Sequence, residues 1–372
     1  MNQQLRNHAD QIVREAIAAV QPDAAVQRAF RGMDFPGRVL LVAAGKAAWQ
    51  MAKAASDCLG DRIENGVVVT KYDHVMGPVA NFSCFEAGHP VPDENSFRGT
   101  QAALDLVADL TEKDTVLFLL SGGGSALFEK PLITGAELQD ITGQLLACGA
   151  DIVEINTIRK RLSQVKGGRF AQLCWPGKVE AVILSDILGD PLDMIASGPA
   201  CPDTSTAEDA MRIREKYSLR MSAEAERLLG IETPKTLDNV HTQINGSVRE
   251  LCSAAAKTCR DLGYEPILLT DQLCCQAREA GSFLASILKT HASDSKALAF
   301  IAGGETVVQL TGKGLGGRNQ ELALAAAAAQ NNGIADHSSA PRSALVAASS
   351  SSTSYISAAP SLRTTSFTSA MR

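Results

Sequence analysis

Two glycine-containing segments combine the residue types that bind an anion. Lys46 follows Gly45 directly after an apolar run, so a glycine turn and an ammonium group are expected at the start of a helix. The second segment is an SGGGS run, whose consecutive glycines expose backbone N–H groups between two hydroxyls and so suit phosphate or carboxylate oxygens. Its members are Ser121, Gly122, Gly123, Gly124 and Ser125. Neither segment matches the GxxxxGK(S/T) or GxGxxG patterns of nucleotide-binding loops, and a plain turn is the alternative for both.

Two aspartates form the third candidate, because carboxylates at the end of a strand hold Mg²⁺ or orient a hydroxyl group. Asp186 and Asp190 follow the apolar run 179–185 in the segment SDILGDP. Their spacing leaves two roles open, metal ligand for both residues and catalytic group for Asp186. Helix capping by Asp186 and a turn at Asp190 is the alternative without chemistry.

An arginine at the start of a helix is the fourth candidate. Arg318 and Asn319 follow two glycines in the segment GGRNQE, and Glu305 ends an upstream GGE segment. A guanidinium group in such a place can clamp a phosphoryl group that is being transferred, because its planar fork contacts two oxygens. A solvated loop is the alternative.

Two further segments carry titratable side chains. The stretch 156–169 is basic in an acidic chain, and its Arg159 and Lys166 are candidates for attracting a carboxylate or a nucleotide phosphate. A solvated helix face is the alternative. His89 lies in GHPVPD, where a proton carrier is one interpretation and a rigid structural turn, because of the two prolines, is the favoured one.

The elements that must position these residues alternate between apolar runs and helical stretches. Buried strands are predicted at the start of 38–55 and over 66–70, 114–120 and 179–185, after an amphipathic helix over 4–28. This alternation predicts a Rossmann-like, largely parallel α/β sheet with helices on both faces. Ligands bind outside the carboxyl ends of such strands, which is where the candidate loops fall.

A second α/β series follows, with strands expected over 242–246, 264–270, 297–305 and 306–312 and a last helix over 319–329. We therefore expect an N-terminal Rossmann-like α/β domain over 1–235 and a smaller C-terminal α/β domain over 236–332. The segment 333–372 is rich in serine and loses hydrophobic periodicity, so it is expected to be an irregular tail that leaves the second domain incomplete.

Composition restricts the function classes. The 372 residues have a formal net charge of −6 and only 5% aromatic residues, which argues against a large nucleic-acid footprint. No apolar run is long enough for a membrane span, and the first twenty residues lack the apolar core of a signal peptide. The nine cysteines show no CxxC pair, which favours reduced thiols in the cytoplasm.

Taken in order, these segments resemble those of one family, the class II ATP-dependent glycerate 2-kinases, whose members are often labelled hydroxypyruvate reductases. The matching stretches run from about residue 5 to about residue 329. They are GKAAWQMAKAA, GHPVPDENS, SGGGSALFEKP, NTIRKRLSQVKGGRFA, LSDILGDPLDMIASGPACPDTST and AGGETVVQLTGKGLGGRNQELALA.

This resemblance implies a two-domain α/β kinase that uses ATP and Mg²⁺ to phosphorylate D-glycerate at its 2-hydroxyl, giving 2-phosphoglycerate. It also implies that Lys46 and Arg318 are the catalytic pair. The expected partners are small molecules, with no nucleic acid and no membrane, and a homodimer is a further expectation. Two alternatives stay open, an NAD(P)H-dependent hydroxypyruvate reductase and a non-catalytic remnant of the kinase.

Overall fold

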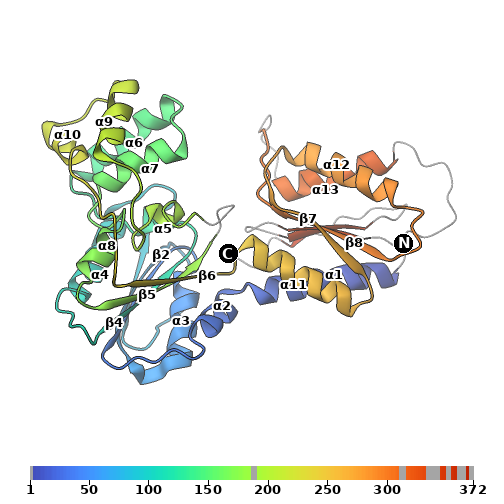
Figure 1. Cartoon of the computed structure of the whole chain (residues 1–372), viewed down its shortest axis with the longest axis horizontal. Coiled ribbons are helices and arrows are strands. Elements are labelled where there is room, and N and C mark those ends of the chain that lie inside the picture. Colours follow the sequence, from blue (N-terminus) through green and yellow to red (C-terminus); the bar gives the residue numbers. More distant parts are fainter. Residues whose placement is uncertain are drawn as a thin grey trace. The chain divides into compact units, whose positions relative to one another are not determined.

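The computed structural model describes residues 3–185, 191–309, 316–331, 344–348, 353–357 and 366–367. The chain separates into two units, one formed by residues 25–245 and the other by residues 1–24 together with 246–372 (Figure 1). Each unit has its own sheet, and each is described by itself below. None of the described helices is long and apolar enough to cross a membrane.

The unit 25–245 is built on a six-stranded sheet in the order β3-β2-β1-β4-β5-β6, and all of its neighbouring strands are parallel. The strands are β1 (Val39–Ala44), β2 (Ile63–Lys71), β3 (Phe82–Ala87), β4 (Thr115–Leu120), β5 (Lys178–Leu184) and β6 (Val240–Asn245). The order reverses between β1 and β4, so a crevice at their carboxyl ends is the expected place for a ligand.

Helices cover both faces of this sheet, and the alternation of β1 residues shows how. Leu41 faces a core that includes α2 (Pro22–Ala29) and α3 (Ala48–Leu59). Val42 faces the opposite core, which includes α4 (Glu94–Leu106), α5 (Gly124–Leu127) and α8 (Arg169–Leu173). Because β1 is buried along its whole length, its sequence is apolar on both faces, as is typical of a central parallel strand.

Four more helices of this unit form a cluster with a separate core. They are α6 (Gly135–Ala147), α7 (Ile152–Arg161), α9 (Ala207–Lys216) and α10 (Ala223–Leu229). Asp151 caps α7 and Thr206 caps α9, each through a capping box that satisfies the first backbone N–H groups of the helix. A short 3-10 segment, η2 (Ile195–Ser197), follows β5 and packs against α5 and α7.

The other unit has a five-stranded sheet in the order β11-β10-β9-β8-β7. Strands β7 (Glu265–Leu273), β8 (Leu298–Gly304) and β9 (Ala344–Ala348) are parallel, whereas β10 (Thr353–Ser357) and β11 (Ser366–Phe367) are antiparallel additions. Figure 1 shows α12 (Ala277–Thr290) and α13 (Arg318–Asn331) on one face of β7 and β8. Helices α1 (Gln3–Ala19) and α11 (Val248–Asp261) lie side by side on the other face.

The units divide the chain differently from the boundary expected at residue 236. Strand β6 belongs to the first sheet, because Val240–Asn245 pairs in parallel with β5. Helix α1 belongs to the other unit, because it packs along α11, where Thr258 donates a 2.7 Å hydrogen bond to Glu15. The helix expected over 4–28 is two helices, since Pro22 begins a new one after a break at Val20 and Gln21.

The C-terminal residues also differ from the expectation of an irregular tail. Three short strands, β9 to β11, lie within 333–372, and β9 pairs with β8 from Ala299↔Ala344 to Gly303↔Ala348. An apolar ALVAA run beside a buried parallel strand satisfies its backbone groups in that ladder. The other residues of 333–372 lie outside the described part. Of the strand expected over 306–312, the described residues contain a single bridge between Gln276 and Val307.

Candidate active site

The loops that follow β1 and β4 are hydrogen-bonded to each other at the point where the strand order reverses. The Ser121 N–H donates to the Ala44 carbonyl at 2.9 Å, and the Lys46 N–H donates to the Gly122 carbonyl at 2.9 Å. Two segments that lie about 75 residues apart in the sequence therefore form one backbone surface at the carboxyl edge of the sheet. This is the place at which open α/β sheets bind ligands.

Gly45 makes this close approach possible. Its φ of +122° is unfavourable for other residues, and a Cβ at this position would lie 2.3 Å from Ser121 Oγ. Ser121 is buried, and its hydroxyl accepts a 3.0 Å hydrogen bond from the Ala47 N–H. The Lys46 side chain is exposed. The backbone carbonyl of Lys46 accepts a 3.3 Å hydrogen bond from Thr70 Oγ1. The backbone is fixed while the ammonium group is accessible.

His89 lies beside the glycine run, although the sequence favoured a purely structural role for its segment. Gly123 has a left-handed φ of +89°, and a Cβ there would lie 3.1 Å from His89 Cδ2 and 3.2 Å from Lys46 Cγ. The imidazole, the lysine stem and the glycine backbone therefore adjoin. Strand β3, which precedes this segment, was not among the strands predicted from the sequence. It brings His89 to the edge that the carboxyl ends of parallel strands share.

Arg159 and Lys166 lie behind the glycine run. Both donate to the carbonyl of Ser125, Arg159 through Nη2 at 2.8 Å and Lys166 through Nζ at 2.9 Å. Both also pair with the buried carboxylate of Glu129, at 3.4 Å and 3.5 Å. The sequence does not single out Glu129, since its only signal there is a lone acid between Phe128 and Lys130.

Burial has a large electrostatic effect on Lys166. Its side chain is fully enclosed, and desolvation of the ammonium group lowers its pKa to about 8, partly opposed by the Glu129 carboxylate. Lys166 is therefore not on the surface where an anion in solvent would meet it. The side chain of Arg159 is 13% exposed, so it too is mostly enclosed.

Asp186 and Asp190, the predicted metal pair, lie outside the described residues. Ser185, which precedes them, is buried at the carboxyl end of β5, the neighbour of β4. Within the described ranges, no group of three or more His, Cys, Asp or Glu side chains is placed to hold a metal ion.

In the other unit, the structure brings together Glu305 and Arg318. Glu305 directly follows β8, its N–H donates to the Leu273 carbonyl at 2.8 Å, and its carboxylate forms an ion pair with the Arg318 guanidinium. Arg318 begins α13, donates to the Thr306 carbonyl at 3.3 Å, and keeps a third of its side chain exposed. Asn319 is the next residue of the same first turn and is half-buried. A guanidinium group is thus held at the carboxyl edge of this second sheet.

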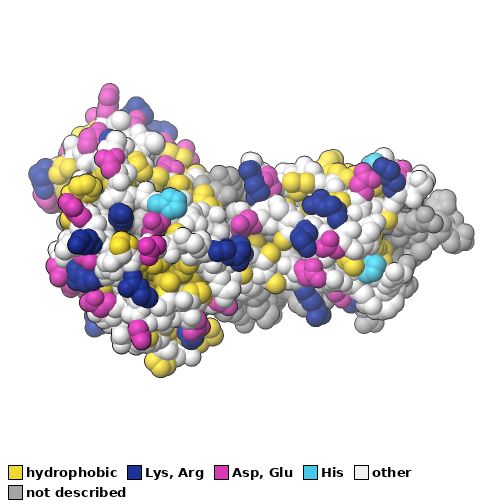
Figure 2. Space-filling view, turned by 60° about the horizontal axis from the view of Figure 1, so that its bottom comes forward, with side chains coloured by type: hydrophobic (Ala, Val, Ile, Leu, Met, Phe, Trp, Pro, Cys, Tyr) yellow, Lys and Arg dark blue, Asp and Glu magenta, His cyan; other side chains and the backbone are white. Residues whose placement is uncertain are grey.

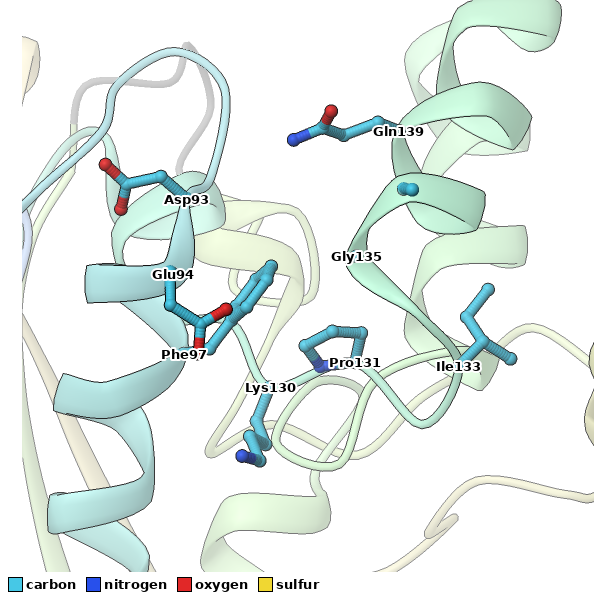
Figure 3. A pocket seen from close by; sticks show the side chains of 9 residues that line it. Asp93, Glu94, Phe97, Lys130, Pro131, Ile133, Gly135 and Gln139 are labelled. Atoms are coloured by element: carbon cyan, nitrogen blue, oxygen red, sulfur yellow. The ribbon is translucent and has the colours of Figure 1, made fainter.

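A pocket of about 560 Å³ opens next to the His89 segment (Figure 3). Phe97 and Glu94 line it from α4, Gln139 from α6, and Lys130 and Pro131 from the segment between them, as Figure 3 shows. Its lining mixes apolar, acidic, basic and amide groups. On the face of the molecule in Figure 2, the described basic and acidic side chains are likewise interspersed.

Two family models match the chain. Residues 8–230 match a domain of unknown function, DUF4147, and residues 298–351 match the MOFRL family. The second match continues beyond residue 329, where the motifs that carry the resemblance end. Together the matches include both candidate regions, around Lys46 and around Arg318.

Among proteins of known name, the chain is 53% identical over 331 residues to a D-glycerate 2-kinase of Thermotoga maritima, which covers 87% of this chain and 79% of that protein. It is 40% identical to a glycerate 2-kinase of Pyrococcus horikoshii, over 85% of this chain and 77% of the relative. A putative hydroxypyruvate reductase of Agrobacterium vitis is 37% identical, over 79% of this chain and 69% of the relative.

The fold has a close counterpart among solved structures. The crystal structure of glycerate kinase from Thermotoga maritima superposes with a TM-score of 0.84 at 52% identity, covering 88% of this chain and 80% of that one. A Pyrococcus horikoshii protein superposes with a TM-score of 0.79 at 39% identity, over 87% of this chain and 80% of that one.

Proposed function

The chain belongs to the glycerate kinase family, and from this premise we propose that it is a D-glycerate 2-kinase. It transfers the γ-phosphoryl group of ATP to the 2-hydroxyl of D-glycerate and releases 2-phosphoglycerate. Small-molecule substrates of this kind suit the loops at the carboxyl edge of each sheet, which are the usual place for a ligand in open α/β sheets. Phosphoryl transfer requires mainly positioning and charge stabilisation, which backbone N–H groups and fixed cations supply.

The observation that carries the proposal is the placement of Lys46. Its backbone is hydrogen-bonded to Gly122 at 2.9 Å, whereas its side chain is exposed beside Gly123 and His89. We propose that the ammonium group neutralises charge on the phosphoryl group in transfer. The backbone of the Ser121–Ser125 run binds anionic oxygens of one substrate next to it, since Gly122, Gly123 and Ser125 are half-buried rather than enclosed.

Arg318 is the second proposed catalytic residue. Its pairing with Glu305 and its bond to the Thr306 carbonyl orient the guanidinium group while part of it is exposed. A pre-oriented fork of this kind loses little entropy when it contacts two phosphoryl oxygens. Asn319 and Glu305 serve in this proposal as binding and orienting groups around it.

Asp186 and Asp190 complete the proposed site, with Asp186 also a candidate catalytic group. Their carboxylate oxygens are the ligands that Mg²⁺ prefers. In the sequence they follow Ser185, and Ser185 lies at the edge of the sheet where Ser121 follows β4. A magnesium ion held there would neutralise phosphate charge on ATP. The carboxylate of Asp186 would otherwise accept a hydrogen bond from the 2-hydroxyl and orient it for attack.

A coupled assay tests the proposal. The purified chain, ATP, Mg²⁺ and D-glycerate should yield ADP and 2-phosphoglycerate, the latter identified by its conversion with enolase. Formation of 3-phosphoglycerate alone, or of no phosphoglycerate with active relatives as positive controls, would contradict it. Turnover in the range of roughly 1–100 s⁻¹ is expected for a kinase.

A hydroxypyruvate reductase is the second candidate, favoured by the name of the Agrobacterium vitis relative and by a strand order that is also found in dinucleotide-binding folds. Against it, the turn after β1 reads Ala44-Gly45-Lys46 and lacks the GxGxxG pattern that approaches a pyrophosphate. Oxidation of NADH or NADPH by hydroxypyruvate without ATP, followed at the nicotinamide absorbance band, would favour the reductase.

A further inference from the structure

The buried side of the Ser121–Ser125 run holds contacts that the proposed reaction does not use. Lys166 Nζ donates to the carbonyls of Ser125 at 2.9 Å and Phe128 at 3.1 Å, which lie at the end of the run and just after it. It also donates to the carbonyl of Ala196 at 3.5 Å and lies 3.5 Å from the Glu129 carboxylate. One ammonium group thus joins two chain segments.

This geometry leaves Lys166 no capacity for a substrate. An ammonium group has three N–H donors, and four protein oxygens already surround the one on Lys166. Its side chain is fully buried, so an anion would have to displace both the carbonyls and the Glu129 carboxylate to reach it. The contacts assign the side chain to the loop rather than to a ligand.

The second segment that Lys166 holds has an unusual backbone. Ala196, Ser197 and Gly198 are three consecutive residues in the left-handed region, with φ of +51°, +61° and +64°. Alanine and serine rarely adopt this conformation, so the surrounding contacts must impose it. The N–H groups of Gly167 and Gly168 supply two of them, donating to the carbonyls of residues 197 and 198 at 3.0 Å and 2.7 Å.

Residues 196–198 in turn bear on the glycine run. A Cβ on Gly124 would lie 2.8 Å from the Cβ of Ala196, so the backbone of the run packs directly on this methyl group. Ser197 is fully buried and donates from its hydroxyl to Asn156 Oδ1 at 2.9 Å, which anchors the segment on α7. The glycine run is therefore supported from below by residues 196–198 and tied at its end by Lys166.

We propose that Lys166 is a positioning residue, which holds the backbone of the Ser121–Ser125 run in its anion-binding conformation by joining Ser125 to residues 196–198. Arg159 assists it, since its guanidinium donates to the same Ser125 carbonyl at 2.8 Å and pairs with the same Glu129 carboxylate. Neither side chain contacts substrate. The placement of the run stands on the contacts alone, and only its effect on catalysis rests on the proposed kinase function.

Hydrogen exchange of the full chain tests the placement without any activity. Lys166→Met keeps much of the length and apolar volume of the side chain and removes the donors. Exchange of the amides in a peptide that covers 121–125 should become about tenfold faster or more, beyond any change in the core strands β1 and β4. Unchanged exchange of this peptide in a folded Lys166→Met chain would overturn the proposal.

Arg38→Met is the matched control. Arg38 donates to the buried carboxylate of Asp114 at 2.9 Å, so its loss also leaves a buried acid without its cation. These residues precede β1 and β4 at the amino edge of the same sheet, opposite the glycine run. In Arg38→Met, amide exchange in 121–125 should change by no more than exchange in strands β1 and β4. A selective increase in 121–125 equal to that of Lys166→Met would show that the run responds to the loss of any buried ion pair in this unit, and would overturn the proposal.

Kinetics of the two variants test the catalytic consequence. Lys166→Met should lower kcat for D-glycerate phosphorylation by about 10–100-fold, because displaced backbone N–H donors no longer stabilise the transition state. The kcat of Arg38→Met should stay within about threefold of that of the parent chain. Faster exchange with unchanged kcat would refute the catalytic link while leaving the placement intact. Absence of kinase activity in the parent would refute the proposed function and leave the exchange test valid.

Arg159→Met provides a second variant if Lys166→Met does not fold. It removes one of the two donors to the Ser125 carbonyl from a side chain that is 13% exposed, and should give a smaller change of the same kind in exchange and kcat. A change of KM for one substrate with exchange and kcat unaltered would indicate direct substrate contact and overturn the positioning role of Arg159.

Discussion

Lys46 is the residue on which the proposed chemistry depends most directly. Lys46→Ala should lower kcat by about 100–1,000-fold, the usual effect of losing one group that stabilises transition-state charge. Stability should change little, because the side chain is exposed and the turn is held by backbone bonds. Steady-state kinetics and a thermal melt check both points. Lys53→Ala, which removes an exposed lysine paired with Asp57 on α3, is the control and should keep full activity.

Arg318 should resist replacement even by lysine. Its guanidinium group is oriented by Glu305 and by the Thr306 carbonyl, and a lysine cannot reproduce a fork that contacts two oxygens at once. We expect Arg318→Lys to lose about 90% or more of kcat, although the charge is kept. Arg278→Lys is the control and should keep its kcat, because Arg278 is an exposed arginine that lies 3.5 Å from Glu321. Full activity of Arg318→Lys would show that only net charge matters at this position.

The buried ammonium group of Lys166 predicts a pH dependence of stability. Its pKa is lowered from an ordinary 10.5 to about 8 in the folded chain, so the unfolded chain binds more protons between these values. The contribution of Lys166 to the free energy of unfolding therefore rises as pH increases from about 8 to about 10.5, by at most about 3 kcal/mol. Denaturant unfolding at pH 7.5 and pH 10.5 measures it against Lys166→Met. An equal pH response of both chains would contradict the folded-state titration.

At the scale of elements, the junction of β1 with β4 depends on a position that tolerates no side chain. Gly45→Ala would force a left-handed φ of +122° on alanine and place its Cβ 2.3 Å from Ser121 Oγ. We expect the free energy of unfolding to fall by about 1–3 kcal/mol. We also expect a large fall in kcat, because the loops after β1 and β4 must separate. Gly143→Ala is the control. Nothing lies within 4 Å of its new Cβ on α6, so it should stabilise slightly or have no effect.

At the scale of the whole molecule, the two units predict which fragments fold. A fragment of residues 25–245 contains the complete six-stranded sheet and both of its cores. It should unfold in one cooperative transition. A fragment of residues 1–235 lacks β6 and carries α1 without its partner α11, so it should melt several degrees lower. Circular dichroism melts of both fragments check this. Equal midpoints would favour the boundary near residue 236.

The sequence by itself determined the fold class and the family. Alternating apolar runs and helices predicted a parallel α/β sheet, and the six-stranded sheet and the likeness to a solved glycerate kinase confirm it. The motif order indicated the glycerate kinase family, which the relatives confirm. Gly45 and the Ser121–Ser125 run could be identified as site candidates because strand, turn and helix signals are local, and carboxyl ends of parallel strands share an edge.

Only the tertiary structure decided which distant segments meet. Pairing of β6 with β5 and packing of α1 on α11 are non-local, and no periodicity within either segment specifies a partner. The same holds for Lys166. In the sequence it is one cation of a basic stretch, equally suited to solvent or to an anion. Its burial beneath Ser125, with Glu129 as counter-ion, follows from packing among segments 125–129, 159–166 and 196–198. Long-range packing sets burial, and burial decides whether a charged side chain binds a ligand or supports the backbone that does.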